Sequence, residues 1–292
     1  MPVRQPVVAG RFYPGNPEAL CKVVRDFLAV SAESALPGRS RTAWGCMLPH
    51  AGYVFSGAVA GATLDGLTLP RRLIILCPNH TGRGEPLGVW PAGAWLTPLG
   101  QVPVDEALAG ALIAAGGGFR PDVQSHLGEH SIEVLLPFLQ AAQGQGGEVA
   151  PAVVPVCVGT RHPGALARAG EALASVLVRP ENADVGVVVS SDMNHYEDVR
   201  RTEQKDALAL ERALAADPDG LLRVVEEADI SMCGAAPLAI ALHAARRLGQ
   251  VGVELAAHDT SATASGDTQH VVGYAGLRLY LERGQKADIP AA

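Results

Sequence analysis

Three stretches of this sequence run from apolar residues directly into side chains that could bind a metal or move a proton. The first, WGCMLPHAG, carries His50; the second, RRLIILCPNHTG, carries His80; the third, VGVVVSSDMNHY, carries Asp192 and His195. The apolar run of the second stretch has the length and composition of a strand buried on both faces. Ligands of open α/β sheets bind just beyond the carboxyl ends of the strands. The three stretches therefore predict a functional site at one edge of a sheet.

These residue types fit a metal site. Neutral imidazole is a common metal ligand, and two histidines with one carboxylate, here His50, His80 and Asp192, make the facial arrangement of non-haem Fe(II) enzymes. A histidine beside such a site, such as His195, would act as general acid or base. Taken singly, each residue has a simpler interpretation, as a histidine hydrogen-bonded in a loop or an aspartate that caps a turn. The repetition of one pattern at three strand ends is a stronger signal for a site than any one residue, and it leaves both the metal-ligand and the simpler interpretation open.

Cys233 is a further candidate ligand. Gly234 and Pro237 place it at or near the start of a predicted helix, a position that lowers the pKa of a thiol and favours the metal-binding thiolate. The alternative interpretation is a buried cysteine that packs as a small hydrophobic residue. We assign that second interpretation to the three cysteines that lie within apolar runs, which are Cys46, Cys77 and Cys157.

The segment HLGEH, residues 126–130, matches the H-x-x-E-H pattern of inverzincin proteases, which needs both histidines on one face of an unbroken helix. Gly128 argues against such a helix. The alternative interpretation places His130 at the N-terminus of the next helix, pointing toward the same pocket as the strand-end residues. His162 and His243 lie in polar or helical stretches, and solvent or packing roles suffice for both.

The elements that must hold these residues alternate between strands and helices. Apolar periodicity predicts helices over 17–30, 56–67, 104–115, 129–142, 164–178 and 233–248, with a charged helical pair over 201–228. Strands are predicted before His50, over 73–77, 149–159 and 185–192, and over 251–257 and 271–280, with an ordered arm over 1–15, short strands or a loop over 83–103 and loops over 31–42 and 258–268. This alternation predicts an α/β sheet in a single domain, residues 1–292.

The composition narrows the class of protein. The chain has 292 residues, 48% of them hydrophobic, which is ample for a large core. A net charge of −7 without a Lys/Arg cluster argues against a nucleic-acid partner. We find no apolar run of about 18 residues and no long apolar h-region near the N-terminus, so we expect neither a transmembrane helix nor a signal peptide. Five cysteines without CxxC spacing fit reduced thiols, and we expect a cytoplasmic protein.

With these residues identified, the chain resembles the Memo (mediator of cell motility) family, called AmmeMemoRadiSam system protein B in microbes. The matching motifs follow the family's order along nearly the whole chain: RQPVVAGRFYPG, LPHAGYVFSG, CPNHTG, GEHSIEVLLPF, VPVCVG, VVVSSDMNHYED, MCGAAPLAIAL and SGDTQHVVGYAGLRLY. The resemblance implies a three-layer α/β/α domain with a central mixed sheet, like that of the class III extradiol ring-cleavage dioxygenases.

The resemblance also implies roles for individual residues. In those dioxygenases two histidines and a glutamate hold Fe(II), and the Memo family places a cysteine where the glutamate would be. The implied metal is Fe(II), with copper or zinc as alternatives, because a thiolate admits softer metals. Carried over residue by residue, the metal ligands are His50, His80 and Cys233, the acid–base pair is Asp192 and His195, and a further pocket residue is His130.

Three kinds of function are open at this point. The first is a mononuclear non-haem iron oxidoreductase that acts on an unidentified small molecule. The second is a copper- or iron-binding redox protein without turnover, and the third is a module that binds a peptide or partner in the same pocket. Microbial members of the family often occur with a radical SAM protein, which implies a pathway link to such a protein. No membrane partner is expected.

Overall fold

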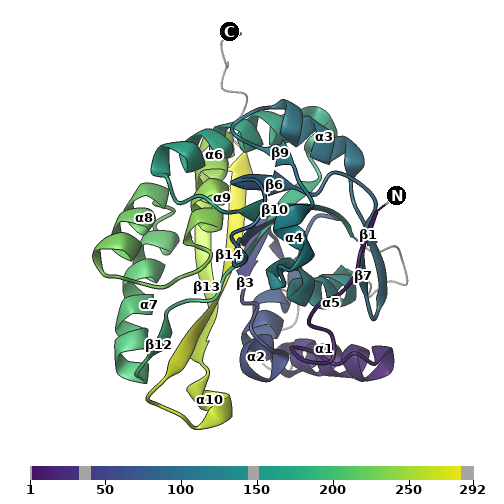
Figure 1. Cartoon of the computed structure of the whole chain (residues 1–292). Coiled ribbons are helices and arrows are strands. Elements are labelled where there is room, and N and C mark those ends of the chain that lie inside the picture. Colours follow the sequence, from purple (N-terminus) through teal and green to yellow (C-terminus); the bar gives the residue numbers. More distant parts are fainter. Residues whose placement is uncertain (1, 33–40, 144–150, 284–292) are drawn as a thin grey trace.

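The computed structural model describes residues 2–32, 41–143 and 151–283 of the chain. Within them, a nine-stranded mixed sheet forms the centre (Figure 1). Its strands follow the order β12 (His195–Glu197), β14 (Val271–Arg283), β3 (Gly45–Leu48), β11 (Val185–Ser190), β5 (Arg72–Pro78), β10 (Ala152–Val158), β6 (Leu87–Val89) and β9 (Arg120–Pro121), and β13 (Gly249–Thr260) pairs with β14. The four strands β3, β11, β5 and β10 run parallel, whereas β14 and β6 run antiparallel to them.

Helices cover both faces of this sheet. On one face, α2 (Tyr53–Leu64) and α5 (Ser131–Gln143) cover the sheet, and α1 (Pro17–Ala32) packs on these two helices. On the other face lie α3 (Glu106–Ala114), α6 (Pro163–Leu177) and α9 (Ala235–Leu248), with α8 (Pro218–Glu227) beside α9 and α7 (Val199–Leu214) beside α8. Side chains of β5 alternate between the two cores: Ile74 and Leu76 pack under α6 and α9, and Leu73 and Ile75 pack under α2 and α5. This strand is buried on both faces, which explains its unbroken apolar sequence.

Smaller elements complete the described chain. β1 (Val3–Arg4), β7 (Ala94–Thr97) and β8 (Gly100–Pro103) form a three-stranded sheet, and β2 (Arg41–Thr42) pairs with β4 (Leu67–Thr68). Two one-turn helices are α4 (Gln124–Leu127) and α10 (Ala262–Ser265), and a 3-10 turn spans Pro180–Asn182. Among the described helices, none combines the length and apolar character that crossing a membrane requires.

The predicted α/β class is confirmed, and the predicted helices are all present with ends shifted by a few residues. The predicted loop over 258–268 is partly wrong. β13 continues through Thr260 because β14 pairs with it along its whole length, and α10 follows. The region predicted as short strands or a loop over 83–103 contains β6, β7 and β8. Most of the loop predicted over 31–42 lies outside the described residues.

One buried carboxylate holds the N-terminal arm in place. Glu133 on α5 accepts the backbone N–H groups of Val7 and Val8 and the hydroxyl of Tyr13, at 2.7–3.0 Å. Glu133 also forms an ion pair with Arg4, whose side chain is equally buried. Burial and the neighbouring Glu133 raise the pKa of Tyr13, so its hydroxyl remains a donor. The arm predicted as ordered is therefore tied to α5, which also borders the site.

The topology brings the predicted site residues together. β3, β11 and β5 are neighbours and run parallel, so their carboxyl ends meet at one edge of the sheet. Two residues beyond these ends stand His50, Asp192 and His80, respectively. The N-terminus of α5, with His130, reaches the same edge, as the ring contacts described below show.

Candidate metal centre

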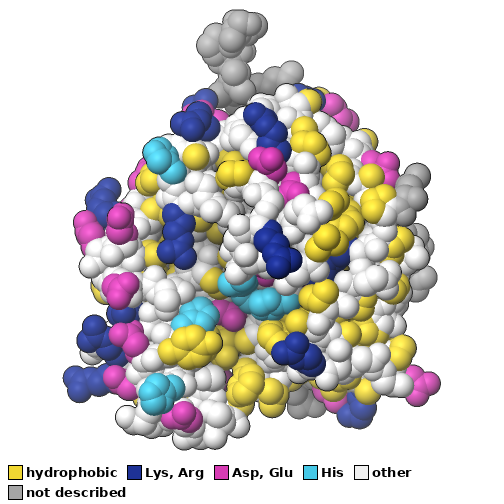
Figure 2. Space-filling view, viewed as in Figure 1, with side chains coloured by type: hydrophobic (Ala, Val, Ile, Leu, Met, Phe, Trp, Pro, Cys, Tyr) yellow, Lys and Arg dark blue, Asp and Glu magenta, His cyan; other side chains and the backbone are white. Residues whose placement is uncertain are grey.

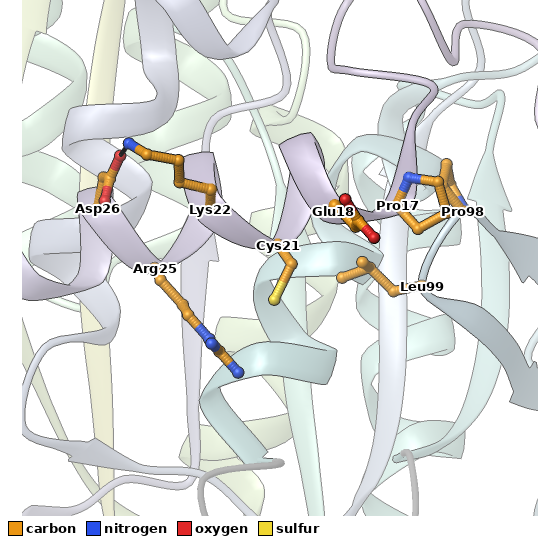
Figure 3. A pocket seen from close by; sticks show the side chains of 8 residues that line it. All are labelled: Pro17, Glu18, Cys21, Lys22, Arg25, Asp26, Pro98 and Leu99. Carbon is orange, nitrogen blue, oxygen red and sulfur yellow. Dashed lines mark hydrogen bonds and ion pairs between the residues drawn. The ribbon is translucent and has the colours of Figure 1, made fainter.

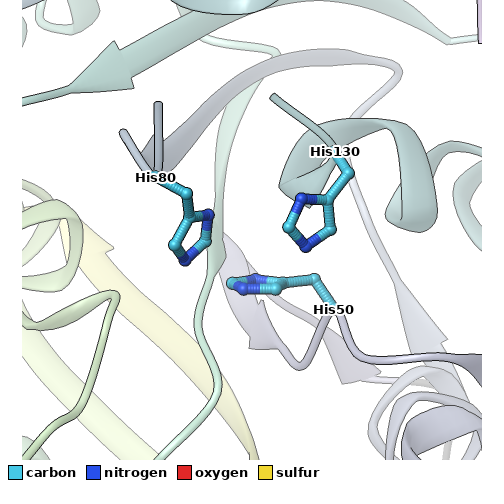
Figure 4. A group of neighbouring side chains, drawn as sticks. All are labelled: His50, His80 and His130. Carbon is cyan, nitrogen blue, oxygen red and sulfur yellow. The ribbon is translucent and has the colours of Figure 1, made fainter. Parts of the chain in front are cut away.

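Three imidazoles meet at this edge of the sheet. His50 and His80 follow β3 and β5, and His130 comes from the turn before α5; Figure 4 shows the three rings turned toward one another. The ring centroids are 5.3 Å apart for His50 and His80, 5.6 Å for His50 and His130, and 5.2 Å for His80 and His130. One nitrogen from each ring lies within 4.8 Å of one from each of the others, so the group could hold a metal ion.

His80 is oriented by the buried carboxylate of Glu129. The backbone N–H of His80 donates to Glu129 Oε2 at 2.6 Å, and Nδ1 donates to Oε1 at 2.9 Å. Because an ionised carboxylate only accepts, Nδ1 carries the proton, and Nε2 has a free lone pair in the neutral ring. Burial would lower the pKa of His80, but the hydrogen bond and charge of Glu129 raise it, so a metal ion would compete with a proton for Nε2. Burial alone would raise the pKa of Glu129, but the hydrogen bonds from His80 outweigh it and lower that pKa to about 2. Such a carboxylate–histidine pair is the usual support for a metal-binding imidazole.

The tautomer of His50 follows from a chain of two hydrogen bonds. Ser190 Oγ lies 2.8 Å from the carbonyl oxygen of Ser131 and 2.7 Å from His50 Nδ1. The carbonyl only accepts, so the single hydroxyl proton points to it, and His50 Nδ1 must donate to Ser190. His50 Nε2 therefore also has a free lone pair. Burial, followed by the nearby charges of His80 and His130, lowers the pKa of His50 well below its ordinary value and keeps the ring neutral.

His130 is held differently from the other two histidines. Its Nδ1 lies 3.6 Å from Glu129 Oε1, too far for a hydrogen bond, and its ring makes no hydrogen bond within the described part of the chain. The ring is packed instead: it stacks on His80 at an interplanar angle of 22° and meets the edge of Phe12 at 5.0 Å. Burial lowers the pKa of His130. This imidazole lacks the anchoring that a metal ligand usually has.

Asp192 and Cys233 complete the surroundings of His50. Asp192 Oδ1 accepts the backbone N–H of His50 at 2.8 Å, and Oδ2 lies 3.9 Å from His50 Nε2. Cys233 Sγ lies 3.5 Å from the same Nε2 and 3.2 Å from the backbone nitrogen of Asp192. A nitrogen and a sulfur that ligate one tetrahedral ion lie about 3.5 Å apart. The Cys233 sulfur and His50 Nε2 are therefore spaced so that they could bind the same ion. The three side chains whose ligand atoms all lie close to one another, however, are the three histidines.

The predicted position of Cys233 is confirmed, but the predicted effect on its thiol is wrong. Cys233 stands directly before Gly234, the N-cap of α9. Burial, followed by the negative charge of Asp192, raises the pKa of the Cys233 thiol instead of lowering it. Desolvation of the sulfur outweighs the helix dipole. As a thiol, Cys233 can donate to the lone pair on His50 Nε2. Burial likewise raises the pKa of the Asp192 carboxyl.

His195 lies at the same end of the sheet but makes no ring contact with the three-histidine cluster. Its Nδ1 lies 3.0 Å from the carbonyl oxygen of Ser231, and its backbone N–H donates to Ser231 Oγ at 2.8 Å. A protonated His195 would lower the pKa of Asp192 and of His50. Asp192 follows β11 and His195 opens β12, so the predicted acid–base pair lies at the end of the sheet that carries the predicted ligands, and its role stays a prediction.

The HLGEH segment does not form the helix that the protease motif needs. α4 and α5 are separate, and the chain is interrupted at Gly128 as predicted. His126 points away from the cluster, and its Nε2 lies 3.0 Å from the carbonyl oxygen of Gly88. Glu129 instead orients His80, a role that the sequence reasoning did not assign to it. The sequence did contain a sign of this role: Glu129 is a carboxylate at the start of a strongly apolar helix, and a carboxylate that is buried there needs hydrogen-bond partners.

The remaining predicted histidines lie away from the site. His162 Nδ1 accepts the backbone N–H of Ala165 and caps α6. His243 Nε2 lies 3.6 Å from the Asp219 carboxylate. Both positions agree with the solvent or packing roles predicted for them.

The cluster opens to the surface on one side. Figure 2 shows histidine side chains gathered in a hollow with an acidic group between them and hydrophobic side chains at its border. The side chains of His80 and His130 are 36% and 24% exposed, whereas that of His50 is 3% exposed. A ligand would therefore reach the cluster past His80 and His130, with His50 at the bottom.

A separate hollow lies along α1 and has a volume of about 570 Å³ (Figure 3). Cys21, Arg25 and Leu99 are among its lining residues, and Lys22 pairs with Asp26 beside it at 2.7 Å. It contains none of the predicted site residues. Its lining holds one cysteine and four charged side chains but no histidine, so we place the functional site at the histidine cluster.

Comparison with known proteins identifies the family of this chain. A family model described as Memo-like protein matches residues 4–278. The chain belongs to the Memo family. MEMO1 family proteins of Methanopyrus kandleri, Thermotoga maritima and Sulfurisphaera tokodaii are 39%, 38% and 36% identical to it over 281, 286 and 286 residues. These alignments cover 94–95% of this chain and 98–99% of each relative, so the predicted resemblance is confirmed along the whole Memo-like fold.

Proposed function

We propose that this Memo-family chain binds one redox-active transition metal ion, Fe(II) in the first place, and acts as a non-haem iron oxidoreductase related to the extradiol dioxygenases. The observation that carries the proposal is the matched anchoring of His50 and His80. Each donates Nδ1–H to a buried group, Ser190 or Glu129, which directs the other nitrogen, Nε2, to the ligand side of the ring; at His50 the Cys233 thiol is the neighbour that shares this lone pair. Both rings would therefore bind an ion without first changing tautomer.

Cys233 is the third ligand in this proposal, and His130 is a neighbour. The sulfur of Cys233 has the spacing from His50 Nε2 that a shared ion requires. His130 is close enough to ligate, but no hydrogen bond anchors its ring, so it can present either nitrogen to a bound molecule. Cys233 is a thiol without metal and would release its proton on binding an ion. Two imidazoles and the resulting thiolate fit Fe(II), copper or zinc, and exclude a site specialised for Mg²⁺ or Ca²⁺.

When bound, Fe(II) would supply one-electron chemistry and open coordination positions. The chain's own residues would supply proton transfer. His195 donates through Nδ1 to Ser231, so its Nε2 can accept a proton. Asp192 lies buried beside His50, and its raised pKa favours a carboxyl that can return a proton. His130 lies on the exposed side and would meet the incoming molecule first.

Metal analysis of anaerobically purified protein tests the ligand set. We expect about one Fe(II) per chain after reconstitution, a loss of binding in His50→Ala, His80→Ala and Cys233→Ser, and retention in His130→Ala. His162→Ala, which removes a surface histidine from a helix N-cap, is the matched control. Retention of iron by His50→Ala and His80→Ala would refute the site. Loss in His130→Ala with retention in Cys233→Ser would refute the choice of third ligand.

A second candidate function is copper binding without turnover, and the specific observation in its favour is the thiol of Cys233 next to His50. Thiolate and imidazole together suit Cu(I). Competition with a Cu(I) chelator would then show tight binding that depends on Cys233, and oxygen consumption would stay at background with the iron-loaded protein. Oxygen consumption that requires His195 would instead support the oxidoreductase.

A further inference from the structure

The residue before His195 has every polar group paired. Asn194 is 1% exposed, and its backbone N–H donates to Asp206 Oδ1 at 2.9 Å while its carbonyl accepts the N–H of Gly273 at 2.8 Å. Its side-chain nitrogen donates to Glu197 at 2.7 Å, and Oδ1 accepts the N–H of Ser231 at 3.1 Å. A buried side chain satisfied on all sides has one allowed orientation. Asn194 is therefore a fixed point next to His195.

Ser231 connects this fixed point to the His195 ring. Asn194 Oδ1 is an acceptor, so Ser231 Oγ, 3.2 Å away, donates its proton to it. The Ser231 oxygen then accepts the backbone N–H of His195 at 2.8 Å. The carbonyl oxygen of Ser231 can only accept, so His195 Nδ1–H donates a hydrogen bond to it at 3.0 Å. In the neutral ring, this arrangement leaves the proton on Nδ1 and the lone pair on Nε2.

The residue after His195 is held in a strained backbone conformation. Tyr196 has a φ of 61°, in the left-handed region that favours glycine. His195 pairs with Val272 and Glu197 with Val271, so Tyr196 is one extra residue in β12, a β-bulge. Its side chain is 75% exposed, so packing of the ring does not account for the strain. Bulges of this kind redirect a neighbouring side chain beside functional sites.

We propose that Ser231 and Asn194 are positioning residues that hold His195 in the Nδ1–H tautomer, with Nε2 as a proton acceptor at the pocket, and that the bulge at Tyr196 aims the ring. The inference rests on the proposed function for the use of that base, but the tautomer itself does not depend on metal. It also specifies the chemistry of the bound molecule, which must carry an O–H, N–H or S–H group whose proton Nε2 can take.

We call the arrangement of Asn194 and Ser231 around His195 the clamp. Long-range ¹H–¹⁵N NMR of the histidines in the full-length chain, without added metal, tests the clamp directly. His195→Gln identifies the His195 signals by their loss. We expect a single Nδ1–H tautomer in the unmodified chain. Ser231→Ala keeps the carbonyl that accepts Nδ1–H but removes the hydroxyl that joins the His195 backbone to Asn194, so the ring should lose its fixed place and the other tautomer should rise several-fold. Ser231 is exposed, so its loss should not unfold the protein. Ser231→Thr keeps the hydroxyl and should restore the tautomer, and Ser265→Ala, a surface serine on α10, is the matched control.

An Nε2–H tautomer in the unmodified chain, or equal populations in Ser231→Ala and the unmodified chain, would overturn the proposal. Zn²⁺ titration of the same sample separates it from the proposed function. Shifts of the His50 and His80 nitrogens report the metal site, whereas the His195 tautomer reports the clamp. Unchanged His50 and His80 signals with an intact Nδ1–H tautomer would remove the metal function and leave the clamp standing.

The strain at Tyr196 provides an independent readout. Tyr196→Ala and Tyr196→Gly both remove the ring, but only glycine relieves the left-handed backbone. We expect a higher unfolding midpoint for Tyr196→Gly than for Tyr196→Ala, together with a loss of the single His195 tautomer in the glycine variant. Equal midpoints and an unchanged tautomer in both variants would show that the bulge does not aim His195.

Discussion

Glu129→Gln should weaken metal binding through His80 without removing any ligand. The carboxylate of Glu129 accepts five hydrogen bonds: Oε2 takes the backbone N–H of His80, and Oε1 takes His80 Nδ1, the N–H of His130 and both the N–H and the hydroxyl of Ser131. A glutamine has one acceptor oxygen, and its NH₂ group must face a donor wherever it lies. The orientation of least cost keeps the oxygen at Oε1 and sets NH₂ against the His80 N–H.

The size of the effect follows from these contacts. One buried N–H loses its acceptor, which costs about 1–3 kcal/mol of folding stability. The charge that holds His80 Nδ1–H disappears, and loss of such a supporting group lowers metal affinity about 10–100-fold, or about 1.4–2.7 kcal/mol. We therefore expect Glu129→Gln to bind Fe(II) or Cu(I) at least tenfold more weakly, with all three proposed ligands intact.

Glu133→Gln is the matched control, because it makes the same change at a buried carboxylate on α5, four residues after Glu129 in the sequence. Glu133 holds the N-terminal arm through Val7, Val8 and Tyr13 and does not bond to a proposed ligand. Urea unfolding should show a loss of stability in both variants, whereas competition with a metal chelator should show weaker binding only in Glu129→Gln. Equal metal affinities in the two variants would refute the supporting role of Glu129.

Three further predictions test the tautomer of His50, a buried histidine away from the site and the packing of the sheet. Ser190→Ala removes the acceptor of His50 Nδ1–H and should lower metal affinity about tenfold, while Ser175→Ala on α6 should not. Burial lowers the pKa of His126 to about 4, so the contribution of this residue to stability should be full above pH 6.5 and fall by about 3 kcal/mol as the pH drops to about 4; His126→Phe should reduce the pH-dependent loss of stability in urea unfolding by about that amount, and the buried His50 and His130 account for a slope that remains. Gly45→Ala would place a Cβ 1.9 Å from the Val187 carbonyl oxygen and should cost about 3 kcal/mol or more, whereas Gly110→Ala on α3 meets no atom within 4 Å and should be neutral or stabilising.

The sequence predicted much of the fold and the strand-end residues of the site. The unbroken apolar run before His80 predicts a strand buried on both faces, because only such a strand can place every side chain in a core. β5 meets that expectation with Ile74 on one side and Ile75 on the other. Similar apolar runs placed His50 and Asp192 at strand ends. These strands are parallel neighbours, so their carboxyl ends meet at one edge of the sheet. The local patterns also predicted that Gly128 interrupts the helix before His130.

Contacts across the chain decided the rest. Glu129 supports His80 from 49 residues away, and Ser190 fixes the proton of His50 across 140 residues, so no local pattern reports either bond. The thiol of Cys233 shows the same limit: its place before a helix predicted a lowered pKa, whereas burial beside Asp192 raises it.

Residue types and spacing thus determined which side chains could do chemistry, because strand ends and helix starts are local features. Only the tertiary structure decided which nitrogen carries each proton, because each is set by a partner that packing brings from elsewhere in the chain. The same packing separated an anchored pair, His50 and His80, from the unanchored His130.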